Sequence, residues 1–411
     1  MTYNQIEYYC YIILITFISM KVIYESGSLV NNLYCSKCYK SYNYKEDQTF
    51  ATCCEKPLLF SYQLEKTTSK SILNNNVKSI WRYAPLLPIL NSNNIITLGE
   101  GLTPITKIEK LGAQINQEQL FLKDETNNPT GSFKARGISV AVSKLKELGV
   151  KKCIIPTAGN AGGALAAYCA KADIEATIIM PRHTPKVFKD ECNLYGANLL
   201  LVDGLINDCG SKAKELNKYG DFFDVSTLKE PYRLEGKKIM GYEIAESFNW
   251  DLPDYIFYPA GGGTGLIGIW KAFKEMIELG WIKNKLPKMI AVQSSSCSPI
   301  QEAYKDPIHW KENFTPDASI ANGLAVPYPF GMDLMLNVIK ESNGEVCIVE
   351  EQKIKETVHL FSKKEGILIS PEGAATYMAL TQLKNKGIFN VKDSILLLNT
   401  GSGYKYIENV V

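Results

Sequence analysis

The sequence lacks any marked excess of charge of one sign. Its 45 Lys and Arg residues nearly balance its 43 Asp and Glu residues, which leaves a formal net charge of +2 over 411 residues. Nucleic-acid-binding domains usually carry a strong basic excess, so no nucleic-acid partner is expected. Histidine is also scarce, because only three occur and none forms an HExxH pattern. A zinc protease or a centre built from several histidines is therefore not expected.

Long apolar runs are missing as well. The uncharged, mostly apolar run at residues 8–20 is shorter than the about 20 residues that a membrane-spanning helix needs. It has the length of a signal-peptide core, yet no Lys or Arg precedes it and no small-residue cleavage site follows. We therefore treat residues 1–32 as an apolar leader, either signal-like or lying upstream of a true start at Met20, and expect no membrane association.

Cysteine, by contrast, is present in an odd number and in scattered positions. Of the eleven cysteines, Cys153 and Cys169 lie within apolar stretches that resemble core segments. Buried free thiols fit a reducing compartment better than a secreted disulfide framework. The sequence therefore predicts a cytoplasmic protein.

Four cysteines gather in residues 33–62. Cys35 and Cys38 have the spacing of a zinc knuckle, whereas the second pair, Cys53 and Cys54, is adjacent. Adjacent side chains point in different directions, so an unusual turn is needed before both can reach one tetrahedral metal. The segment is thus either a zinc ribbon or a degenerate ribbon that only packs. The polar residues 63–96, rich in Ser and Asn, are expected to be a linker that wraps onto the next domain.

From about residue 97, short apolar runs alternate with amphipathic stretches. This alternation predicts an α/β fold of parallel βαβ units, in which ligands bind at the carboxyl ends of the strands. The expected strands are residues 120–122, 153–156, 176–180, 199–202, 255–258, 289–292 and 395–398. The expected helices are residues 132–148, 161–171, 211–219, 235–247, 265–279, 352–364 and 374–386.

Three loops that follow these strands carry residues suited to small-molecule chemistry. Lys134 lies in the first turn of a helix, where a cation is locally disfavoured. It is therefore either solvated or held against another group with a lowered pKa, ready to form a Schiff base. Asn160 and its small neighbours open another helix, either as a simple N-cap or as a site that binds an anion such as a carboxylate. The last loop places a hydroxyl, that of Thr400, among glycines, which a structural turn would explain equally well.

A glycine-rich loop after the strand at 255–258 predicts a phosphate cradle. A dinucleotide fingerprint would need an acidic residue at the end of the next strand, and residues 292–294 supply none. A single phosphate monoester is therefore the expected guest. The loop consists of Gly261, Gly262, Gly263, Thr264 and Gly265.

Four ordered motifs connect these loops to a known family. They read Gly-Glu-Gly-Leu-Thr-Pro at 99–104, Asn-Pro-Thr-Gly-Ser-Phe-Lys at 128–134, Glu-Pro-Tyr-Arg-Leu-Glu-Gly-Lys at 230–237 and Pro-Glu-Gly at 371–373. With them, residues 97–405 resemble the fold-type II pyridoxal-phosphate enzymes of the tryptophan synthase β-like superfamily, most closely the threonine synthases. The resemblance implies two doubly wound three-layer α/β/α domains within 97–411, the smaller at about 135–240, behind a small zinc-ribbon-like segment. It also implies a homodimer.

The resemblance assigns a role to each singled-out residue. Lys134 would bind pyridoxal 5′-phosphate covalently and act as the catalytic base, and residues 261–265 would bind its phosphate. Asn160 would bond the pyridine 3′-oxygen, and Thr400 would contact the ring nitrogen. Thr157 and Arg233 would bind a phosphorylated amino acid; taken alone, Arg233 could instead form a salt bridge to Glu230 or Glu235. The metal ligands of the ribbon would be Cys35, Cys38, Cys53 and Cys54.

The implied reaction converts O-phospho-L-homoserine and water to L-threonine and phosphate. Two departures from the threonine synthase pattern leave the identity of the substrate open. Residues 157–161 read Thr-Ala-Gly-Asn-Ala and so carry two hydroxyl groups fewer than the corresponding loop of that family. Thr227 stands where that family has an asparagine. The alternatives are a threonine or serine deaminase and a phosphoserine β-replacement enzyme of the cysteate synthase kind. A dehydrogenase is disfavoured because no acidic residue follows the next strand to bind the ribose of a dinucleotide. A catalytically silent binding protein is disfavoured because Lys134 is present.

Overall fold

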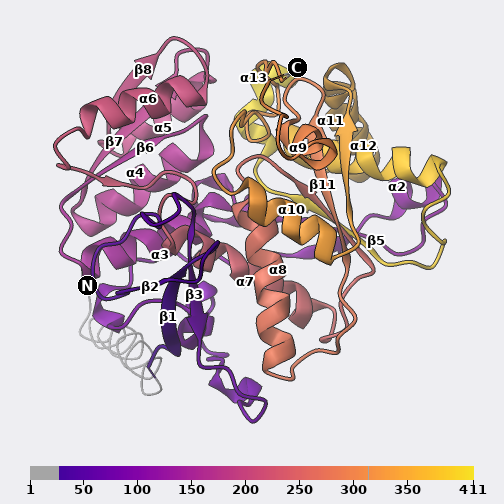
Figure 1. Cartoon of the computed structure of the whole chain (residues 1–411). Helices are drawn as coiled ribbons and strands as arrows, with labels where there is room; N and C mark the ends of the chain where they lie inside the picture. The colour runs from indigo at the N-terminus through magenta and orange to yellow at the C-terminus, as the bar shows by residue number, and fades with distance from the viewer. Residues whose placement is uncertain (1–26, 313) are drawn as a thin grey trace, which may run out of the picture.

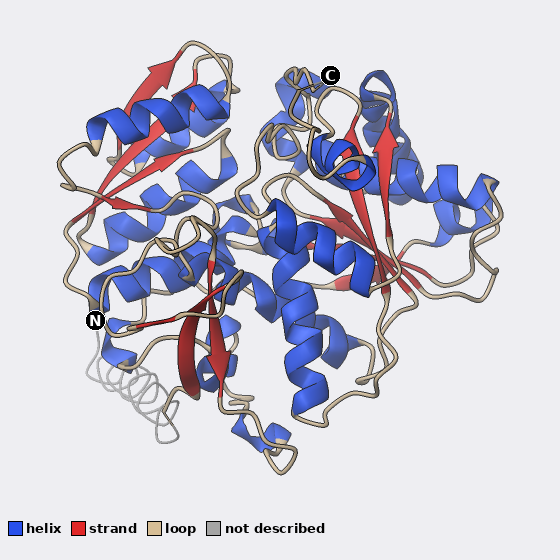
Figure 2. Cartoon of the chain, in the orientation of Figure 1, coloured by secondary structure: helices blue, strands red, loops and turns tan. Residues whose placement is uncertain are grey.

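The chain forms two α/β lobes with a small antiparallel sheet packed against them (Figure 1). A computed structural model describes residues 27–312 and 314–411, so the apolar run at 8–20 lies outside the described residues. Helices and strands alternate through both lobes, as Figure 2 shows. Among the described helices, none combines the length and the apolar character that crossing a membrane requires.

The larger lobe is built on a six-stranded sheet in the order β12-β11-β10-β13-β5-β4. All neighbouring strands are parallel except β4 and β5, and the central strands β10 and β13 are buried along their whole length, as parallel strands covered by helices are. The strands are β4 Ile105–Lys107, β5 Leu120–Asp124, β10 Tyr255–Pro259, β11 Lys288–Ser294, β12 Glu345–Val349 and β13 Ile395–Asn399. The helices are α2 Glu109–Gln114, α7 Tyr232–Ser247, α8 Thr264–Glu278, α9 Pro299–Lys305, α10 Met332–Glu341, α11 Glu351–Glu365, α12 Pro371–Asn385 and α13 Ile407–Val410.

The smaller lobe is built on a four-stranded parallel sheet in the order β8-β7-β6-β9. Helix α3, Lys134–Glu147, joins the lobes because it packs against both α4 and α7. The other elements of this lobe are β6 Lys152–Pro156, β7 Glu175–Pro181, β8 Asn198–Val202, β9 Phe223–Asp224, α4 Asn160–Ala172, α5 Lys186–Leu194 and α6 Ile206–Leu216. The two wound sheets confirm the predicted α/β class.

The cysteine-bearing segment is a three-stranded antiparallel sheet in the order β2-β1-β3. Its strands are β1 Val30–Cys35, β2 Ser41–Tyr42 and β3 Leu58–Tyr62. It packs on α7, because Tyr62 Oη donates a hydrogen bond to Glu235 Oε2 at 2.7 Å and the Phe60 ring lies 6.0 Å from that of Tyr232. We call residues 30–62 the cysteine ribbon.

The stretch between the ribbon and the larger lobe, expected to be a linker, contains three short 3₁₀ helices, Lys70–Ile72, Ile80–Leu86 and Ser92–Asn94. Most of Ile80–Leu86 is buried. Trp81 Nε1 donates to Glu100 Oε1 at 2.9 Å and to Ser139 Oγ at 3.1 Å. The second half of this stretch therefore wraps onto the lobes and supplies part of their core.

Each expected strand and helix of the α/β region is present, although some ends differ. The helix expected at 211–219, for example, begins at Ile206. Other elements were not predicted, among them β12, α5, α10 and the strands of the ribbon. β12 is an edge strand with a partly exposed face, and its short alternating pattern gives a weaker signal than the continuous apolar runs of the central strands.

Candidate active site

A cavity of about 660 Å³ lies where the carboxyl ends of the two parallel sheets meet. The loops predicted from the sequence all reach its wall: Lys134 follows β5, Asn160 follows β6, and Thr400 follows β13. Thr157 and the glycine loop after β10 line it as well. The fold thus brings together residues that lie far apart in the sequence.

Lys134 is the first residue of α3 and is half-buried, because it forms part of the cavity wall. Burial, together with the neighbouring Arg233 cation, lowers the pKa of its amine to about 7, although the Glu372 carboxylate acts in the opposite direction. The amine is therefore close to half-protonated at neutral pH. Lys134 thus lies on the cavity wall and not among the exposed lysines of the outer surface.

The glycine loop forms a concave backbone surface at the start of α8. A Cβ at Gly261 would overlap the carbonyl oxygen of Gly323, and Gly263 adopts a φ of +81° that favours glycine. Because α8 begins at Thr264 and its first amides have no partner within the helix, its positive end faces the cavity. The loop residues that line the cavity are Gly261, Gly262, Gly263 and Thr264.

Two predicted residues lie outside the cavity lining. Gly265 instead donates its backbone N–H to the hydroxyl of Tyr258. Arg233 is buried behind Thr227, and its Nη1 donates to Val225 O at 2.8 Å and to Thr227 Oγ1 at 3.4 Å. Its Nε lies 4.0 Å from Glu230 Oε1 in a buried ion pair, and neither Nε nor Nη2 has a hydrogen-bond acceptor among the described residues. The arginine therefore keeps unused donors one layer behind the wall, beside a carboxylate.

A chain of hydrogen bonds connects the two lobes at the cavity. Asn160 Nδ2 donates to Tyr406 Oη at 3.3 Å, and Tyr406 Oη donates to Glu372 Oε1 at 2.7 Å. Asn160 Oδ1 is buried without a partner in the described part of the chain, so the amide retains unused hydrogen-bonding capacity. Tyr406 has no recognisable signal in the sequence, whereas Glu372 belongs to the motif at 371–373.

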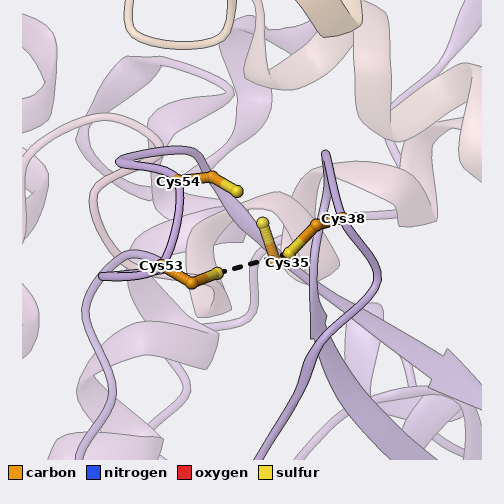
Figure 3. A group of neighbouring side chains, drawn as sticks. All are labelled: Cys35, Cys38, Cys53 and Cys54. Carbon is orange, nitrogen blue, oxygen red and sulfur yellow. Dashed lines mark hydrogen bonds between the residues drawn. The ribbon is translucent and has the colours of Figure 1, made fainter.

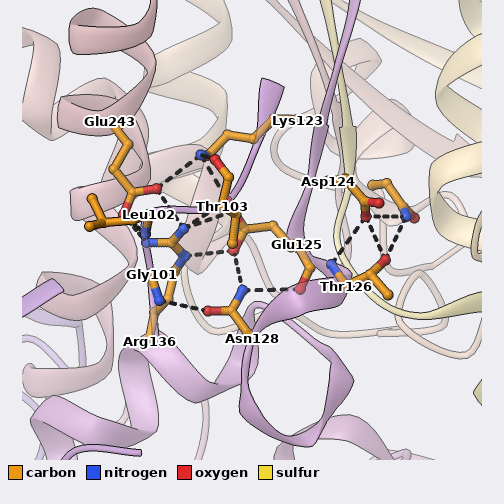
Figure 4. A network of polar contacts seen from close by, with 11 residues as sticks. Gly101, Leu102, Thr103, Lys123, Asp124, Glu125, Thr126, Asn128, Arg136 and Glu243 are labelled. Atoms are coloured by element: carbon orange, nitrogen blue, oxygen red, sulfur yellow. Dashed lines mark hydrogen bonds and ion pairs between the residues drawn. The ribbon is translucent and has the colours of Figure 1, made fainter. Parts of the chain in front are cut away.

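The loop that carries Lys134 is anchored by a buried network of charges (Figure 4). Arg136 lies between two carboxylates, donating from Nε to Glu125 Oε2 at 2.5 Å and from Nη1 to Glu243 Oε1 at 2.6 Å. Lys123 Nζ donates to Glu243 Oε2 at 2.9 Å. Asn128 Nδ2 binds Glu125 Oε2 at 2.8 Å, while Asn128 Oδ1 accepts from the Gly101 amide at 3.0 Å. The motifs at 99–104 and 128–134 are thus joined through one network.

Glu100, in the motif at 99–104, has a structural role. Its buried carboxylate accepts hydrogen bonds from Tyr168 Oη at 2.5 Å and Ser139 Oγ at 2.6 Å, in addition to the Trp81 indole. Ser139 and Tyr168 belong to α3 and α4, so Glu100 connects the helix of Lys134 to its neighbour. This motif is structural, and it positions the lysine rather than contacting the cavity.

The four ribbon cysteines converge on one point (Figure 3). Their sulfur atoms all lie within 4.8 Å of one another, and Cys38 Sγ lies 3.4 Å from Cys53 Sγ. The Lys40 amide, and next the Cys53 thiol, lower the pKa of Cys38 to about 7. The adjacent Cys53 and Cys54 thus both face the same centre, and Glu55, which follows them, adopts a φ of +51°.

With the fold and the cavity described, the chain can be compared with known proteins. The family described as "Pyridoxal-phosphate dependent enzyme" matches residues 96–401, which is well over half of the sequence. The chain belongs to the pyridoxal-phosphate-dependent enzymes. The matched region contains the cavity loops from Lys134 to Thr400 and excludes the cysteine ribbon.

Relatives within the pyridoxal-phosphate-dependent enzymes narrow the comparison. The chain is 33% identical to the threonine synthase of Methanocaldococcus jannaschii over 380 residues, which cover 90% of this chain and 92% of that one. It is 31% identical to the threonine synthase of Methanosarcina acetivorans, with 92% and 93% covered. Maize serine racemase has the same fold, with a TM-score of 0.62, 21% identity, and 74% of this chain and 92% of that one covered. The resemblance to the threonine synthases predicted from the motifs is confirmed.

Proposed function

We propose that this protein is a threonine synthase that uses pyridoxal 5′-phosphate to convert O-phospho-L-homoserine and water to L-threonine and phosphate. The observation that supports it most directly is the identity of 33% to a threonine synthase over 90% of the chain. The cavity supports it independently, because it combines a lysine of lowered pKa with a backbone cradle for a phosphate.

The residues present fit the cofactor. The glycine cradle at the start of α8 suits its phosphate, and the unpartnered Asn160 Oδ1 marks a side chain with free hydrogen-bonding capacity in the cavity. We assign Lys134 to the covalent bond, Asn160 to the 3′-oxygen, Thr400 to the ring nitrogen, and the backbone of residues 261–265 to the phosphate. When bound, pyridoxal phosphate supplies an electron sink that stabilises negative charge at carbons near the substrate amino group.

Lys134 is the group we assign to proton transfer. A pKa near 7 allows its Nζ to accept and release protons at neutral pH with little thermodynamic cost. Its position at the start of α3 is fixed by the network around Arg136, which restricts where the amine can reach. One amine held in this way can act at two adjacent substrate carbons in turn.

The substrate phosphate is assigned to Thr157, on the cavity wall, and to Arg233, behind it. Two guanidinium nitrogens of Arg233 have no acceptor within the described residues, and a planar guanidinium suits a phosphate oxyanion. Thr227 lines the cavity and accepts a hydrogen bond from Arg233 Nη1 at 3.4 Å, so it connects the guanidinium to the cavity wall.

We also assign a structural zinc ion to Cys35, Cys38, Cys53 and Cys54. Four thiolates around zinc at about 2.3 Å place neighbouring sulfur atoms about 3.8 Å apart, close to the spacing of this cluster. Metal analysis of the parent beside Cys35→Ser tests the assignment. One zinc per chain is expected in the parent and much less in the variant. A parent without metal would contradict the site.

Phosphate release from O-phospho-L-homoserine tests the function, with O-phosphoserine, threonine and serine as parallel substrates. Release of phosphate from O-phosphohomoserine together with formation of threonine is expected. Formation of a keto acid and ammonia from threonine alone would indicate a deaminase, and turnover of O-phosphoserine alone would indicate a β-replacement enzyme. Both results would contradict the proposed substrate while leaving the family unchanged.

Lys134→Ala is the matched control for the cofactor assignment. The parent is expected to be yellow, with an absorption band at about 410–420 nm from the lysine-bound cofactor, and the variant is expected to lack this band and all turnover. An unchanged band in the variant would show that another residue holds the cofactor.

The cytoplasmic location and the homodimer remain predictions. The first rests on the many free thiols, since all ten cysteines within the described residues are unpaired. The second rests on the family resemblance, and light scattering of the purified protein tests it: a mass of one chain would contradict it.

A further inference from the structure

The cysteine ribbon contributes to the wall of the catalytic cavity. Phe50 and Glu55, both from the turn that carries Cys53 and Cys54, line the same cavity as Lys134. The family match begins at residue 96, so neither residue belongs to the part of the chain that defines the family. This wall is therefore an addition to the catalytic lobes.

The turn is held against the larger lobe by specific contacts. The Phe50 ring packs edge-on against Phe330, with centroids 5.6 Å apart. Lys56 forms an ion pair with Asp333, at the start of α10. The Gln48 amide donates to Tyr232 Oη, at the start of α7, at 3.4 Å. The turn thus contacts both α7 and α10.

The same turn holds two members of the sulfur cluster. Glu55 directly follows Cys54 and has a φ of +51°, a left-handed conformation that costs a non-glycine residue about 1 kcal/mol or more. A backbone in this conformation persists when its surroundings fix it, and Glu55 directly follows two of the four cysteines that converge on one centre. The Glu55 carboxylate, which is exposed, is therefore connected to the sulfur centre through one short stretch of backbone.

We propose that the cysteine ribbon is a substrate-binding element, in which Phe50 and Glu55 contact the amino-acid substrate and the four-cysteine centre positions them. This inference rests on the proposed function only in that the substrate is an amino acid. Phe50 supplies an apolar surface that excludes water from the substrate, and the Glu55 carboxylate is an acceptor for the ammonium group that a free amino acid carries. Loss of the sulfur centre weakens substrate binding without removing Lys134 or the phosphate cradle.

Steady-state kinetics of the cofactor-loaded enzyme test the two wall residues. The substrate is whichever of O-phosphohomoserine, O-phosphoserine, threonine and serine the parent turns over best. The activity of the parent enzyme on these four substrates therefore tests the proposed function, and the variants test only the role of the two wall residues. Phe50→Ala and Glu55→Gln are each expected to raise KM by about tenfold and to change kcat by less than about twofold. Lys45→Ala, an exposed ribbon residue away from the cavity, is the matched control and should match the parent.

Two further measurements distinguish the loss of a substrate contact from a general loss of structure in the variants. Metal content and the visible absorption band of the bound cofactor should be equal in the parent, Phe50→Ala and Glu55→Gln. Binding of inorganic phosphate, measured by calorimetry, should not weaken in Glu55→Gln, because phosphate has no ammonium group. An unchanged KM in both wall variants, or a parallel loss of phosphate affinity in Glu55→Gln, would overturn the proposal.

A double variant tests the positioning role of the sulfur centre. Cys53→Ser should lose metal and raise KM by a factor similar to that of Phe50→Ala, with the cofactor band retained. In that background, Phe50→Ala should raise KM by less than about twofold more, because the turn no longer holds the ring in place. Fully multiplicative effects would refute the positioning role, and a KM of Cys53→Ser equal to that of the parent would refute it as well.

Discussion

Lys134 should lower the stability of the cofactor-free protein, and this cost can be worked out from its pKa. In the unfolded chain the amine has its ordinary pKa of 10.5, whereas in the folded protein burial, with a smaller contribution from Arg233, lowers it to about 7. The difference corresponds to about 5 kcal/mol, and about 4 kcal/mol remains at pH 7, where the native amine is half-protonated. Because water can enter the cavity beside Lys134, we expect the measured cost to be roughly 2–4 kcal/mol.

Lys134→Met removes the charge and keeps the volume of the side chain. The cofactor-free variant should therefore be more stable than the cofactor-free parent by roughly 2–4 kcal/mol at pH 7, although it has lost all activity. The sign follows from proton binding: between pH 7 and 10.5 the unfolded parent binds more protons than the native parent, so the stability of the parent rises with pH. The advantage of the variant is largest below pH 7 and disappears as the pH approaches 10.5.

Urea denaturation of both cofactor-free proteins at several pH values between 6.5 and 9.5 measures this difference. Lys144→Met is not a suitable control because that lysine pairs with Glu147, so an exposed, unpaired lysine such as Lys45 serves instead. Lys45→Met should change stability by less than about 0.5 kcal/mol at every pH. A Lys134→Met variant no more stable than the parent at pH 7, or a gain independent of pH, would refute the reasoning.

Three further substitutions test the surroundings of the lysine. Glu243→Gln leaves Arg136 with one buried carboxylate instead of two, and it should lower the free energy of unfolding by about 3–5 kcal/mol in denaturant titrations; a loss below 1 kcal/mol would contradict a buried network. Gly261→Ala should abolish cofactor binding in an absorbance titration, because the new Cβ overlaps the Gly323 carbonyl. Tyr406→Phe should keep the fold by circular dichroism yet weaken cofactor binding by about tenfold, since its hydroxyl orients the cavity amide. Wild-type cofactor affinity in either variant would contradict these two assignments.

Much of the fold could be predicted because it depends on local pattern. The continuous apolar runs at β10 and β13 identify buried parallel strands without any knowledge of their neighbours. The four loops could be located for the same reason, since each directly follows such a run. Strand β12 and the ribbon strands could not, because short, half-exposed strands depend on pairing partners that only the folded chain supplies.

The composition of the candidate site was only partly predictable. Lys134, Asn160 and Thr400 have recognisable local surroundings, and the structure places all three on one cavity. Tyr406 and Phe50 have none, since an aromatic residue in a loop contributes to a site only through what lies opposite it. For Arg233 the motif can be recognised in the sequence, but its position one layer behind the cavity wall cannot be predicted from that motif.

The α/β class, the family and the chemistry can be inferred from the amino-acid sequence alone, because each depends on short motifs whose meaning is local. The tertiary structure, in contrast, establishes which distant residues meet. It set the pKa of Lys134 through burial, joined the first two motifs through Arg136, and brought four cysteines to one centre beside the catalytic cavity. These properties depend on burial and on distances between segments remote in sequence, which the order of residues does not express.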